Sequence, residues 1–382
     1  MYQLTEDHIM LRNMVRDLAQ DKVAPRAAEI DEKAEWPWDI VEALRSADLF
    51  GLPFPEQYGG TGTDLLSFII VIEELCKVCA STGLMIAVQG LGSFPIVIAG
   101  NEEQKQRFFP KLASGEHIAA FGLTEPGAGS DAAGTKTRAV RHGDEYLLNG
   151  QKNFITHASV ASIYTVFAST DPSKGTKGIS AFVVESDRPG FKVGKIEHKM
   201  GIRASPTGEL LFEDCRIPAS NLLGKEGEGF KIAMQTLDKS RPGIAAQALG
   251  IAQGAIDFAA KYATERIQFG QPISNLQGIQ FMLADMETQV AAARELVYKA
   301  AVLLQKGDRE ATKYSAMAKM FASDVAMRVT TDAVQILGGY GYIKEYPVER
   351  MMRDAKITQI YEGTNQVQRV VVARAILSKY ER

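Results

Sequence analysis

The sequence contains little cysteine, and this scarcity excludes two classes of protein. Only three cysteines occur among 382 residues, at Cys76, Cys79 and Cys215, which is too few and too unevenly spaced for a disulfide framework. Cys76 and Cys79 form a lone C-x-x-C inside the apolar stretch 68–80, and no second pair completes a zinc site. We therefore predict buried cysteines and no metal site.

Net charge and long hydrophobic runs are also scarce. The formal net charge is −3 at pH 7, and acidic and basic residues are mixed along the chain. Residues 1–12 contain neither an apolar leader core nor an arginine-rich presequence, and no apolar run predicts a membrane span. We therefore expect a soluble protein of a reducing compartment, most simply a bacterial cytoplasm, with neither nucleic acid nor a membrane as partner.

The length predicts two or three packed units, and the hydrophobic pattern divides the chain into three. Residues 1–120 repeat apolar positions at spacings of three and four, as in amphipathic helices. Residues 121–225 change to short alternating runs separated by turn signals, and residues 226–382 return to helical spacing. The predicted fold class is α+β, with an N-terminal helical domain, a middle β-barrel or sandwich and a C-terminal helical bundle.

Several local signals refine this outline. Residues 36–38 and the Gly/Pro cluster at 51–62 predict breaks between N-terminal helices. In the middle region, Asn149 and Gly150 are typical of a turn, and the segments 179–184 and 208–212 are rich in strand formers. In the third region a helix is expected to begin near Leu237.

Glu362 is the strongest candidate for a catalytic group. It lies in the segment Ile-Tyr-Glu-Gly-Thr-Asn-Gln at 360–366, without charged neighbours, so burial would raise its pKa towards neutrality. A carboxylate tuned in this way can remove a weakly acidic proton at neutral pH. The alternative is that Glu362 merely precedes a helix whose N-cap is Thr364 or Asn365.

A glycine-rich segment at 121–131 is the second candidate. Residues 127–132 nearly match the G-x-G-x-x-G/A dinucleotide fingerprint, but a strand-like stretch at 135–140 follows where that fingerprint requires a helix. A stiff turn containing Pro126 can still present backbone N–H groups to a pyrophosphate.

Together these two segments resemble the acyl-CoA dehydrogenase family, and the resemblance covers nearly the whole chain. It implies the order α-domain, β-domain, α-domain, with FAD as the cofactor. It also implies α,β-dehydrogenation of an acyl-CoA thioester to the 2,3-enoyl-CoA. In that reaction Glu362 takes the α-proton, the β-hydride goes to flavin N5, and the Glu362 N–H with a ribityl hydroxyl stabilises the thioester oxygen.

The resemblance assigns cofactor contacts to three groups of residues. In the middle domain these are Phe121, Leu123 and Thr124 at the isoalloxazine, Gly129 and Ser130 at phosphates, and Phe154, Ile155 and Thr156 near N5. Phe154 departs from the family, which often has Trp at this position. Singly, Phe154 and Ile155 are also plausible barrel core, and Thr156 a strand residue.

The other two groups lie in the C-terminal region. Arg266 and Phe269, joined by Gln277, resemble the residues that reach the FAD of a neighbouring subunit, and Gln335, Gly338 and Gly339 match the adenylate side. Thr364, Asn365 and Gln366 match the stretch that follows the base and contacts FAD. A cofactor site completed by two chains implies a homotetramer built as a dimer of dimers.

Substrate contacts are implied for a smaller set. Asp238 and Arg241 correspond to residues that contact the CoA moiety, although a solvated ion pair is the alternative. Ser130, Tyr361 and Gly363 complete the substrate set. Some family members place the base on the helix near position 240, where this chain has a serine, so Glu362 is the base that the resemblance implies.

The sequence also narrows the class of acyl group and the class of electron acceptor. Residues 83–100 resemble the helix at the floor of the acyl pocket and contain no charge, which disfavours a dicarboxylyl substrate such as glutaryl and favours a short, branched or alicyclic group. Gly90, Gly92 and Ser93 either widen this floor or serve helix packing. The resemblance implies an electron-transferring flavoprotein as acceptor; an acyl-CoA oxidase using O2 and a non-catalytic helical binding protein are the alternatives.

Overall fold

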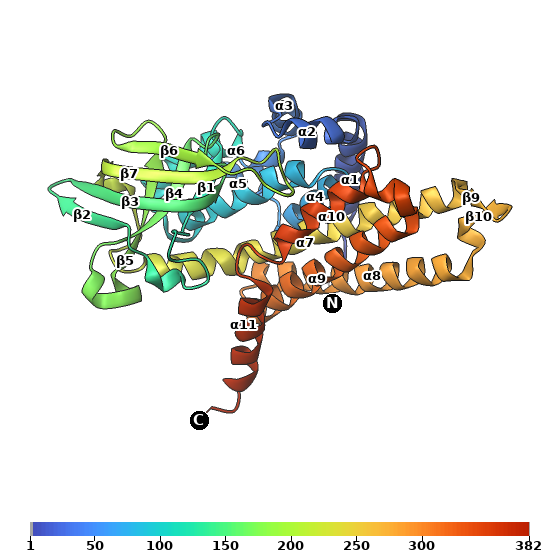
Figure 1. The fold of residues 1–382 in the computed structure, drawn as a ribbon. Helices are drawn as coiled ribbons and strands as arrows, with labels where there is room; N and C mark the ends of the chain where they lie inside the picture. The colour runs from blue at the N-terminus through green and yellow to red at the C-terminus, as the bar shows by residue number, and fades with distance from the viewer. Residues whose placement is uncertain (1–2, 382) are drawn as a thin grey trace.

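The structure, a computed structural model, describes residues 3–381. The N-terminal region is a layer of helices around the buried pair α4 and α5 (Figure 1). Its helices are α1 (Glu6–Leu18), α2 (Ala27–Lys33), α3 (Trp38–Ser46), α4 (Leu65–Cys76), α5 (Ala80–Ala99) and α6 (Glu102–Ala113). The breaks expected at 36–38 and 51–62 lie between α2 and α3 and between α3 and α4.

Helix α5 corrects the expectation that no segment reaches membrane-spanning length. Ala80–Ala99 is long and apolar enough to cross a membrane, but 83% of its apolar 18-residue window is buried inside the protein. A buried core helix has this composition on every face. Cys76 and Cys79, at the junction of α4 and α5, are buried free thiols as predicted.

The middle region is an eight-stranded mixed sheet with the order β6-β7-β3-β2-β4-β5-β8, and β1 pairs in parallel with β4. The strands are β1 (Ala119–Gly122), β2 (Arg138–His142), β3 (Glu145–Thr156), β4 (Ile163–Ser169), β5 (Ile179–Glu185), β6 (Phe191–Ile196), β7 (Thr207–Pro218) and β8 (Leu222–Leu223). Strand β4 is buried along its whole length, so the sheet is covered on both faces there. Ile163 and Phe167 belong to one core cluster, and Tyr164, Val166 and Ala168 belong to another.

The turn predicted at Asn149 and Gly150 is wrong. Strand β3 runs through both residues, and its register against β7 shifts between Leu148 and Gly150, which is a bulge. Gly150 has φ 146°, and a Cβ there would lie 2.7 Å from Thr137 Cα. Glycine is therefore required by close approach of the backbone, which produces the same sequence signal as a turn.

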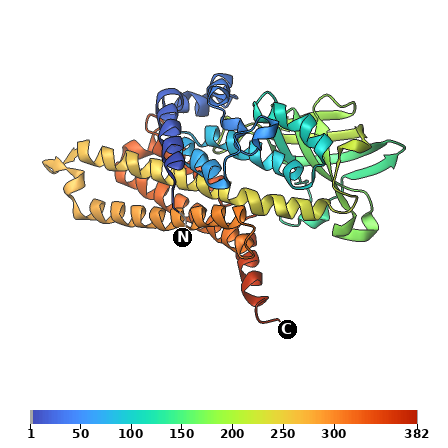
Figure 2. The same cartoon turned by 180° about the vertical axis from the view of Figure 1, so that it is seen from behind.

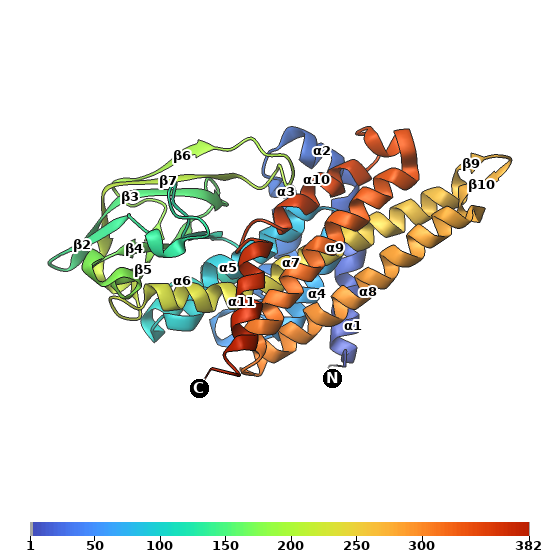
Figure 3. The same ribbon diagram turned by 60° about the horizontal axis from the view of Figure 1, so that its bottom comes forward.

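The C-terminal region is a bundle of long helices (Figures 2 and 3). Its elements are α7 (Gly229–Glu265), the hairpin β9 (Ile267–Gln268) and β10 (Gln271–Pro272), α8 (Gln277–Gln305), α9 (Ala311–Leu337), α10 (Val348–Thr358) and α11 (Asn365–Leu377). Helix α7 begins at Gly229 and not near Leu237, and it continues through Pro242. Figure 1 shows α7 running from beneath the sheet into the bundle, and α11 projecting from the body.

The predicted order of helical, β and helical regions is thus confirmed. The exact boundaries at 120 and 225 stay predictions, although all strands of the large sheet lie within 119–223.

Candidate active site

One cavity brings the two candidate segments together. It has a volume of about 600 Å³ and lies between the sheet and the C-terminal helices. The β-domain lines it with Thr124, Gly129, Ser130, Phe154 and Thr156. The C-terminal region lines it with α10 and with the segment that follows, which contains Tyr361, Glu362, Gly363 and Thr364. The loop 197–202 forms a further wall that sequence reasoning missed.

Glu362 lies on a strained turn. Its φ is 53° and that of Gly363 is 89°, so two successive residues occupy the left-handed region. Such a conformation persists where the surroundings fix it, and here three side-chain hydrogen bonds do so. Gln368 Nε2 donates to the Glu362 carbonyl at 3.2 Å and to the Gly363 carbonyl at 2.9 Å, and Lys319 Nζ donates to the Gly363 carbonyl at 2.8 Å.

The Glu362 carboxylate is tuned by opposing effects. The residue is partly buried at the cavity wall, and desolvation by burial raises its pKa to about 7. The hydroxyl of Ser240, which donates to Glu362 Oε2, and the positive charges of Lys319 and Arg241 oppose that rise. The raised pKa agrees with the direction that the sequence predicted.

Lys319, whose charge acts on Glu362, is a candidate site residue that sequence reasoning missed. Its side chain is fully buried, and burial lowers its pKa to about 7. Besides the Gly363 carbonyl, Lys319 Nζ contacts Asn365 Oδ1 at 3.0 Å. A lone lysine within the apolar run Ala316–Ala322 was the signal that could have identified it.

Asp238 and Arg241 do not form the solvated pair that was the alternative reading. The Arg241 side chain is 5% exposed and donates to Asp238, and its Nε has no hydrogen-bond partner. Asp238 also accepts a hydrogen bond from Thr312 Oγ1 at 2.8 Å. A buried guanidinium with a free N–H directed at the interior is suited to an additional anionic or carbonyl ligand.

The glycine-rich turn on the β side is held by a buried ion pair. Glu125 and Ala128 exchange two backbone hydrogen bonds of 3.1 Å, which close the turn. Lys152 Nζ lies 2.7 Å from Glu125 Oε1 and 3.0 Å from the Leu123 carbonyl, and the backbone N–H groups of Lys136 and Thr137 also donate to the Glu125 carboxylate. Desolvation by burial lowers the pKa of Lys152 to about 8. Sequence reasoning missed this pair, because its partners are far apart in the chain.

The predicted middle-domain contacts divide into two kinds. Phe154 has φ 57°, is 64% exposed and lines the cavity, so it is not barrel core. Ile155 is buried in the β-domain core, and the Phe121 ring packs against Phe167 at a centroid distance of 5.1 Å. Neither of these two, nor Leu123, lines the cavity.

A second hollow collects the residues expected to serve a neighbouring subunit. It has a volume of about 480 Å³ and is lined by Arg266, Phe269, Gly338 and Gly339, with none of the residues of the first cavity. Phe269 is 90% exposed at the tip of the β9–β10 hairpin, which Figure 1 places at the end of the bundle remote from the sheet. Gln277 and Gln335 lie at the near ends of α8 and α9 without lining this hollow.

The residues that follow Glu362 have distinct positions. Thr364 caps α11 by accepting a hydrogen bond from the Val367 N–H at 3.3 Å, as predicted, and it lines the cavity. Asn365 is buried and bonded to Lys319 and to Asp324, whereas Gln366 is exposed on α11. One chain therefore does not bring Gln366 to the cavity.

The glycines of α5 serve packing. A Cβ at Gly90 would lie 2.6 Å from Phe68 Cζ, and one at Gly92 would lie 2.7 Å from the Ala120 backbone nitrogen. Of the two readings left open, helix packing is therefore favoured. The uncharged helix is nevertheless approached by one cation, since Lys239 Nζ lies 4.8 Å from the centroid of the Phe94 ring.

Comparison with known proteins covers all three regions. Residues 5–116, 120–215 and 227–377 match the family models for the N-terminal, middle and C-terminal domains of acyl-CoA dehydrogenase. A short-chain specific acyl-CoA dehydrogenase of Clostridium acetobutylicum is 52% identical, over 98% of this chain and 99% of the relative. A cyclohex-1-ene-1-carbonyl-CoA dehydrogenase of Geobacter metallireducens is also 52% identical, over 99% of this chain and 100% of the relative.

Solved structures agree with the family models. Butyryl-CoA dehydrogenase from Megasphaera elsdenii superposes with a TM-score of 0.96 at 50% identity, covering 99% of this chain and 100% of that chain. A chain from a study of the electron transferring flavoprotein of Acidaminococcus fermentans gives 0.97 at 55% identity, covering 99% of both chains. An acyl-CoA dehydrogenase from Bacillus anthracis, complexed with FAD, gives 0.92 at 36% identity, covering 99% of this chain and 69% of that chain.

A β-sheet domain between two helical domains, with a carboxylate and a glycine-rich turn meeting at their junction, defines a dehydrogenase of the three-domain α-β-α class. The chain belongs to the acyl-CoA dehydrogenase family. It is therefore an acyl-CoA dehydrogenase of a FAD-dependent family.

Proposed function

We propose that the chain catalyses FAD-dependent α,β-dehydrogenation of an uncharged short, branched or alicyclic acyl-CoA, with Glu362 as the general base. The observation that carries this proposal is the position of Glu362. Its carboxylate, with a pKa raised to about 7 by burial, lies on the wall of the cavity that Thr124, Ser130 and Thr156 also line. A base with a pKa near the working pH is ionised in a large fraction of molecules and is still basic enough to remove a weakly acidic proton.

The residues present fit FAD. A Cβ added at Gly127 or Gly129 would have no atom within 4 Å, so the turn leaves open space beside its backbone. The largely exposed ring of Phe154 offers a flat apolar face in the same cavity. We assign Thr124, Gly129, Ser130, Phe154 and Thr156 to this group from one chain. When bound, FAD supplies the acceptor for the β-hydride.

The chain itself handles the proton and the developing negative charge. Glu362 removes the α-proton, while the Ser240 hydroxyl that donates to its carboxylate restrains its orientation. The Glu362 N–H makes no hydrogen bond within residues 3–381, and this leaves it available as a donor to the thioester oxygen. One such preorganised donor contributes about 3–4 kcal/mol to transition-state stabilisation.

The substrate class rests on α5 and on the relatives. Helix α5 contains no charged residue, and neighbouring atoms already occupy the space beside Gly90 and Gly92. Both observations favour a compact, uncharged acyl group. The relatives described above are specific for short-chain and cyclohexene-carbonyl thioesters. Arg241, with its unpartnered Nε, and Asp238 are assigned to the CoA moiety, and Tyr361 and Gly363 to the acyl end.

The second hollow supports a shared cofactor site. Arg266, Phe269, Gly338 and Gly339 lie together on a surface that the first cavity does not reach, and a neighbouring chain can bring them to it. Exposed apolar residues on the projecting helix α11, including Val370, Ile376 and Leu377, support the same conclusion. We therefore propose a homotetramer, with Gln277, Gln335 and Gln366 near the shared contacts and an electron-transferring flavoprotein as acceptor.

Anaerobic absorbance titration with straight, branched, cyclic and dicarboxylyl CoA thioesters tests the function. We expect the flavin band to bleach with one uncharged class and the reduced protein to reoxidise rapidly with electron-transferring flavoprotein. Rapid reoxidation by O2 with peroxide release would instead indicate an oxidase. Protein that remains colourless after incubation with FAD would contradict the enzymatic proposal altogether and favour a binding role.

A further inference from the structure

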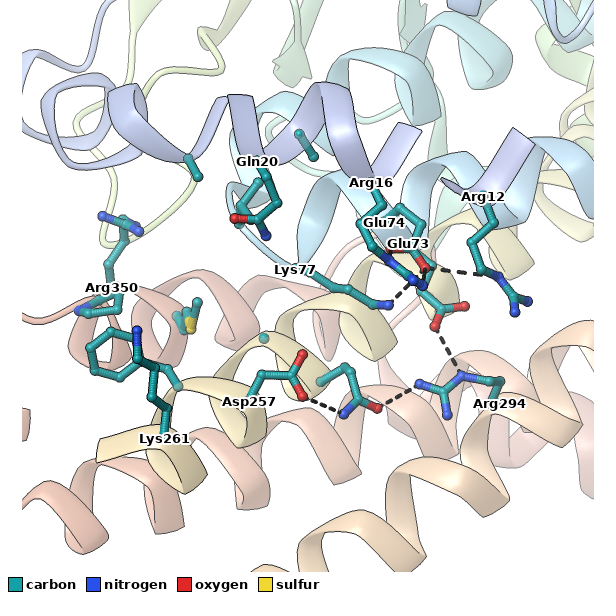
Figure 4. Close-up of a pocket in the computed structure, with 18 residues that line it drawn as sticks. Arg12, Arg16, Gln20, Glu73, Glu74, Lys77, Asp257, Lys261, Arg294 and Arg350 are labelled. Atoms are coloured by element: carbon teal, nitrogen blue, oxygen red, sulfur yellow. Dashed lines mark hydrogen bonds and ion pairs between the residues drawn. The ribbon is translucent and has the colours of Figure 1, made fainter. Parts of the chain in front are cut away.

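A further cavity is separate from the candidate active site. It has a volume of about 800 Å³ and lies between the N-terminal helices α1 and α4 and the C-terminal helices α7, α8 and α10 (Figure 4). It shares no lining residue with the cavity around Glu362. Nothing in the proposed dehydrogenation uses it.

Charges at one end of this cavity are mutually satisfied. Glu74 accepts hydrogen bonds from Arg16 at 3.2 Å and from Lys77 at 2.8 Å, and Glu73 lies 3.0 Å from Arg294 Nε. Figure 4 shows these contacts as a chain of dashed lines on one side of the view. Buried carboxylates that are paired in this way offer no vacant position to a ligand.

The opposite end carries unpaired positive charge. Arg350 is 9% exposed, and its side chain makes no hydrogen bond or ion pair with any residue in 3–381. The exposed Lys261 lines the same end, likewise without a partner in the described chain. Figure 4 shows both side chains there, with no dashed line reaching either. A largely buried guanidinium without a partner is costly, and an anion removes that cost.

The acidic groups nearby do not neutralise this end. Asp354, one turn beyond Arg350 on α10, is the buried acid that acts on it; its carboxylate accepts the Ile202 N–H, and desolvation raises its pKa to about 7. Asp257 on α7 accepts a hydrogen bond from Gln253 at 3.0 Å. Cys79 is a buried thiol whose pKa is raised by burial, so it carries no compensating charge at neutral pH.

We propose that this end of the cavity binds the phosphate group of a small molecule. Arg350 supplies a planar fork and Lys261 a point charge, and two cations match a dianion better than a carboxylate. The apolar remainder of the ligand packs on Phe258 and Met351, which line the same cavity. A volume of about 800 Å³ is within the range of small-molecule sites.

Calorimetric titration of the full chain loaded with FAD tests the proposal, with phenyl phosphate, inorganic phosphate and benzoate as probes at constant ionic strength. We expect saturable binding of phenyl phosphate, weaker binding of inorganic phosphate and at least about tenfold weaker binding of benzoate. Equal affinity for benzoate and phenyl phosphate would overturn the assignment to phosphate. Absence of saturable binding beyond that of sodium chloride would overturn the site.

Three variants locate the binding. Arg350→Gln and Lys261→Gln should each weaken phenyl phosphate binding about tenfold or more. Lys306→Gln, the matched change at an exposed lysine that lies outside this cavity, should leave the affinity unchanged. Because Lys261 is exposed, its variant tests the site even if Arg350→Gln does not fold. Unchanged affinity in Lys261→Gln and in any folded Arg350→Gln protein would place the binding elsewhere and overturn the proposal.

Discussion

Two fully buried lysines, Lys152 and Lys319, support the two halves of the candidate active site in different ways. Lys152 is 2.7 Å from the Glu125 carboxylate, so the glycine-rich turn is held by a closed ion pair. Lys319 contacts the oxygens of Gly363 and Asn365, and none of the carboxylates in residues 3–381 lies within ion-pair distance of it. Its charge therefore acts on Glu362 from beyond direct contact. In the β half of the site, the charges of Lys152 and Glu125 cancel within one ion pair. In the helical half, the charge of Lys319 has no ion-pair partner among the described residues and acts on Glu362.

The largest effect on activity is expected when Glu362, the proposed base, is replaced. Glu362→Gln keeps the shape of the side chain and removes its basicity. The rate of flavin bleaching by substrate under anaerobic stopped-flow conditions should fall by about 10²–10⁴-fold, the usual contribution of a general base. FAD content and far-ultraviolet circular dichroism should match the parent protein. A bleaching rate within twofold of the parent would show that another group is the base.

Removing the paired lysine should chiefly affect stability. Lys152→Met leaves the Glu125 carboxylate buried without its cation, so the free energy of unfolding should fall by about 3–5 kcal/mol. Urea denaturation of the flavin-loaded protein measures this change. A double variant, Lys152→Met with Glu125→Gln, should recover part of the loss. If the single variant were as stable as the parent, the Glu125–Lys152 ion pair would not stabilise the fold.

The pKa of Glu362 predicts a pH dependence of stability. Its value in the folded protein, about 7, lies above the ordinary value of 4.5. The folded state therefore binds more protons, so this group's contribution is complete below pH 4.5 and is lost as the pH rises through 7. The loss should be about 3 kcal/mol, since each pKa unit corresponds to about 1.4 kcal/mol. Between pH 4.5 and 7, the free energy of unfolding should fall less steeply in Glu362→Gln, and parallel curves would contradict the raised pKa.

Removing the unpaired lysine should affect the pH profile more than the fold. In Lys319→Met the positive charge that lowers the pKa of Glu362 is lost, so the acidic limb of kcat/KM should move to higher pH. For a rise of about one pKa unit from 7, the ionised fraction of Glu362 at pH 7, and activity with it, should fall about fivefold. Lys313→Met on the same helix, where Lys313 pairs with Glu310, is the matched control. An unshifted limb would limit Lys319 to a structural role.

The last effect concerns the hydroxyl that touches the base. Ser240→Ala removes one donor to the Glu362 carboxylate, and a single hydrogen bond of this kind is worth about 1 kcal/mol. The acidic limb should move upward at least as far as in Lys319→Met, because the Ser240 hydrogen bond lowers the pKa of Glu362 more than the charge of Lys319 does, and KM should change little. A fall in activity as large as that of Glu362→Gln would indicate that Ser240 takes part directly in proton transfer.

The sequence predicted the order of the three regions because periodicity is a local signal. It also predicted that Glu362, Thr364 and the 124–130 turn belong to one site, because the two segments together resemble the acyl-CoA dehydrogenase family. The sequence pattern placed the start of α7 too late. Glycine and proline usually signal a break in a helix, yet Gly229 packs against the Ser180 backbone and Pro242 lies within α7. Such effects depend on neighbours distant in the chain.

The missed residues have the same explanation. Lys319, the Glu125–Lys152 pair and the loop 197–202 reach the site only through tertiary contacts, and a lysine in an apolar run does not reveal which carbonyl it will bind. From the sequence, the side chain of Phe154 could belong either to the core of the β-domain or to the cofactor surface. Its positive φ, which decides the question, is not readable from the residue type.

The continuity of α7 has a geometric consequence. Ser240 lies on this helix and Arg266 directly follows it, so the two are about 39 Å apart at 1.5 Å per residue. In the shared cofactor site that we propose, α7 would hold the two groups of cofactor residues of one chain at this distance from each other. Each chain would then lend its β9–β10 hairpin to a neighbour and receive one in return. A mixed pair in which one chain lacks Glu362 and the other lacks Arg266 would then contain one fully intact site and one doubly defective site.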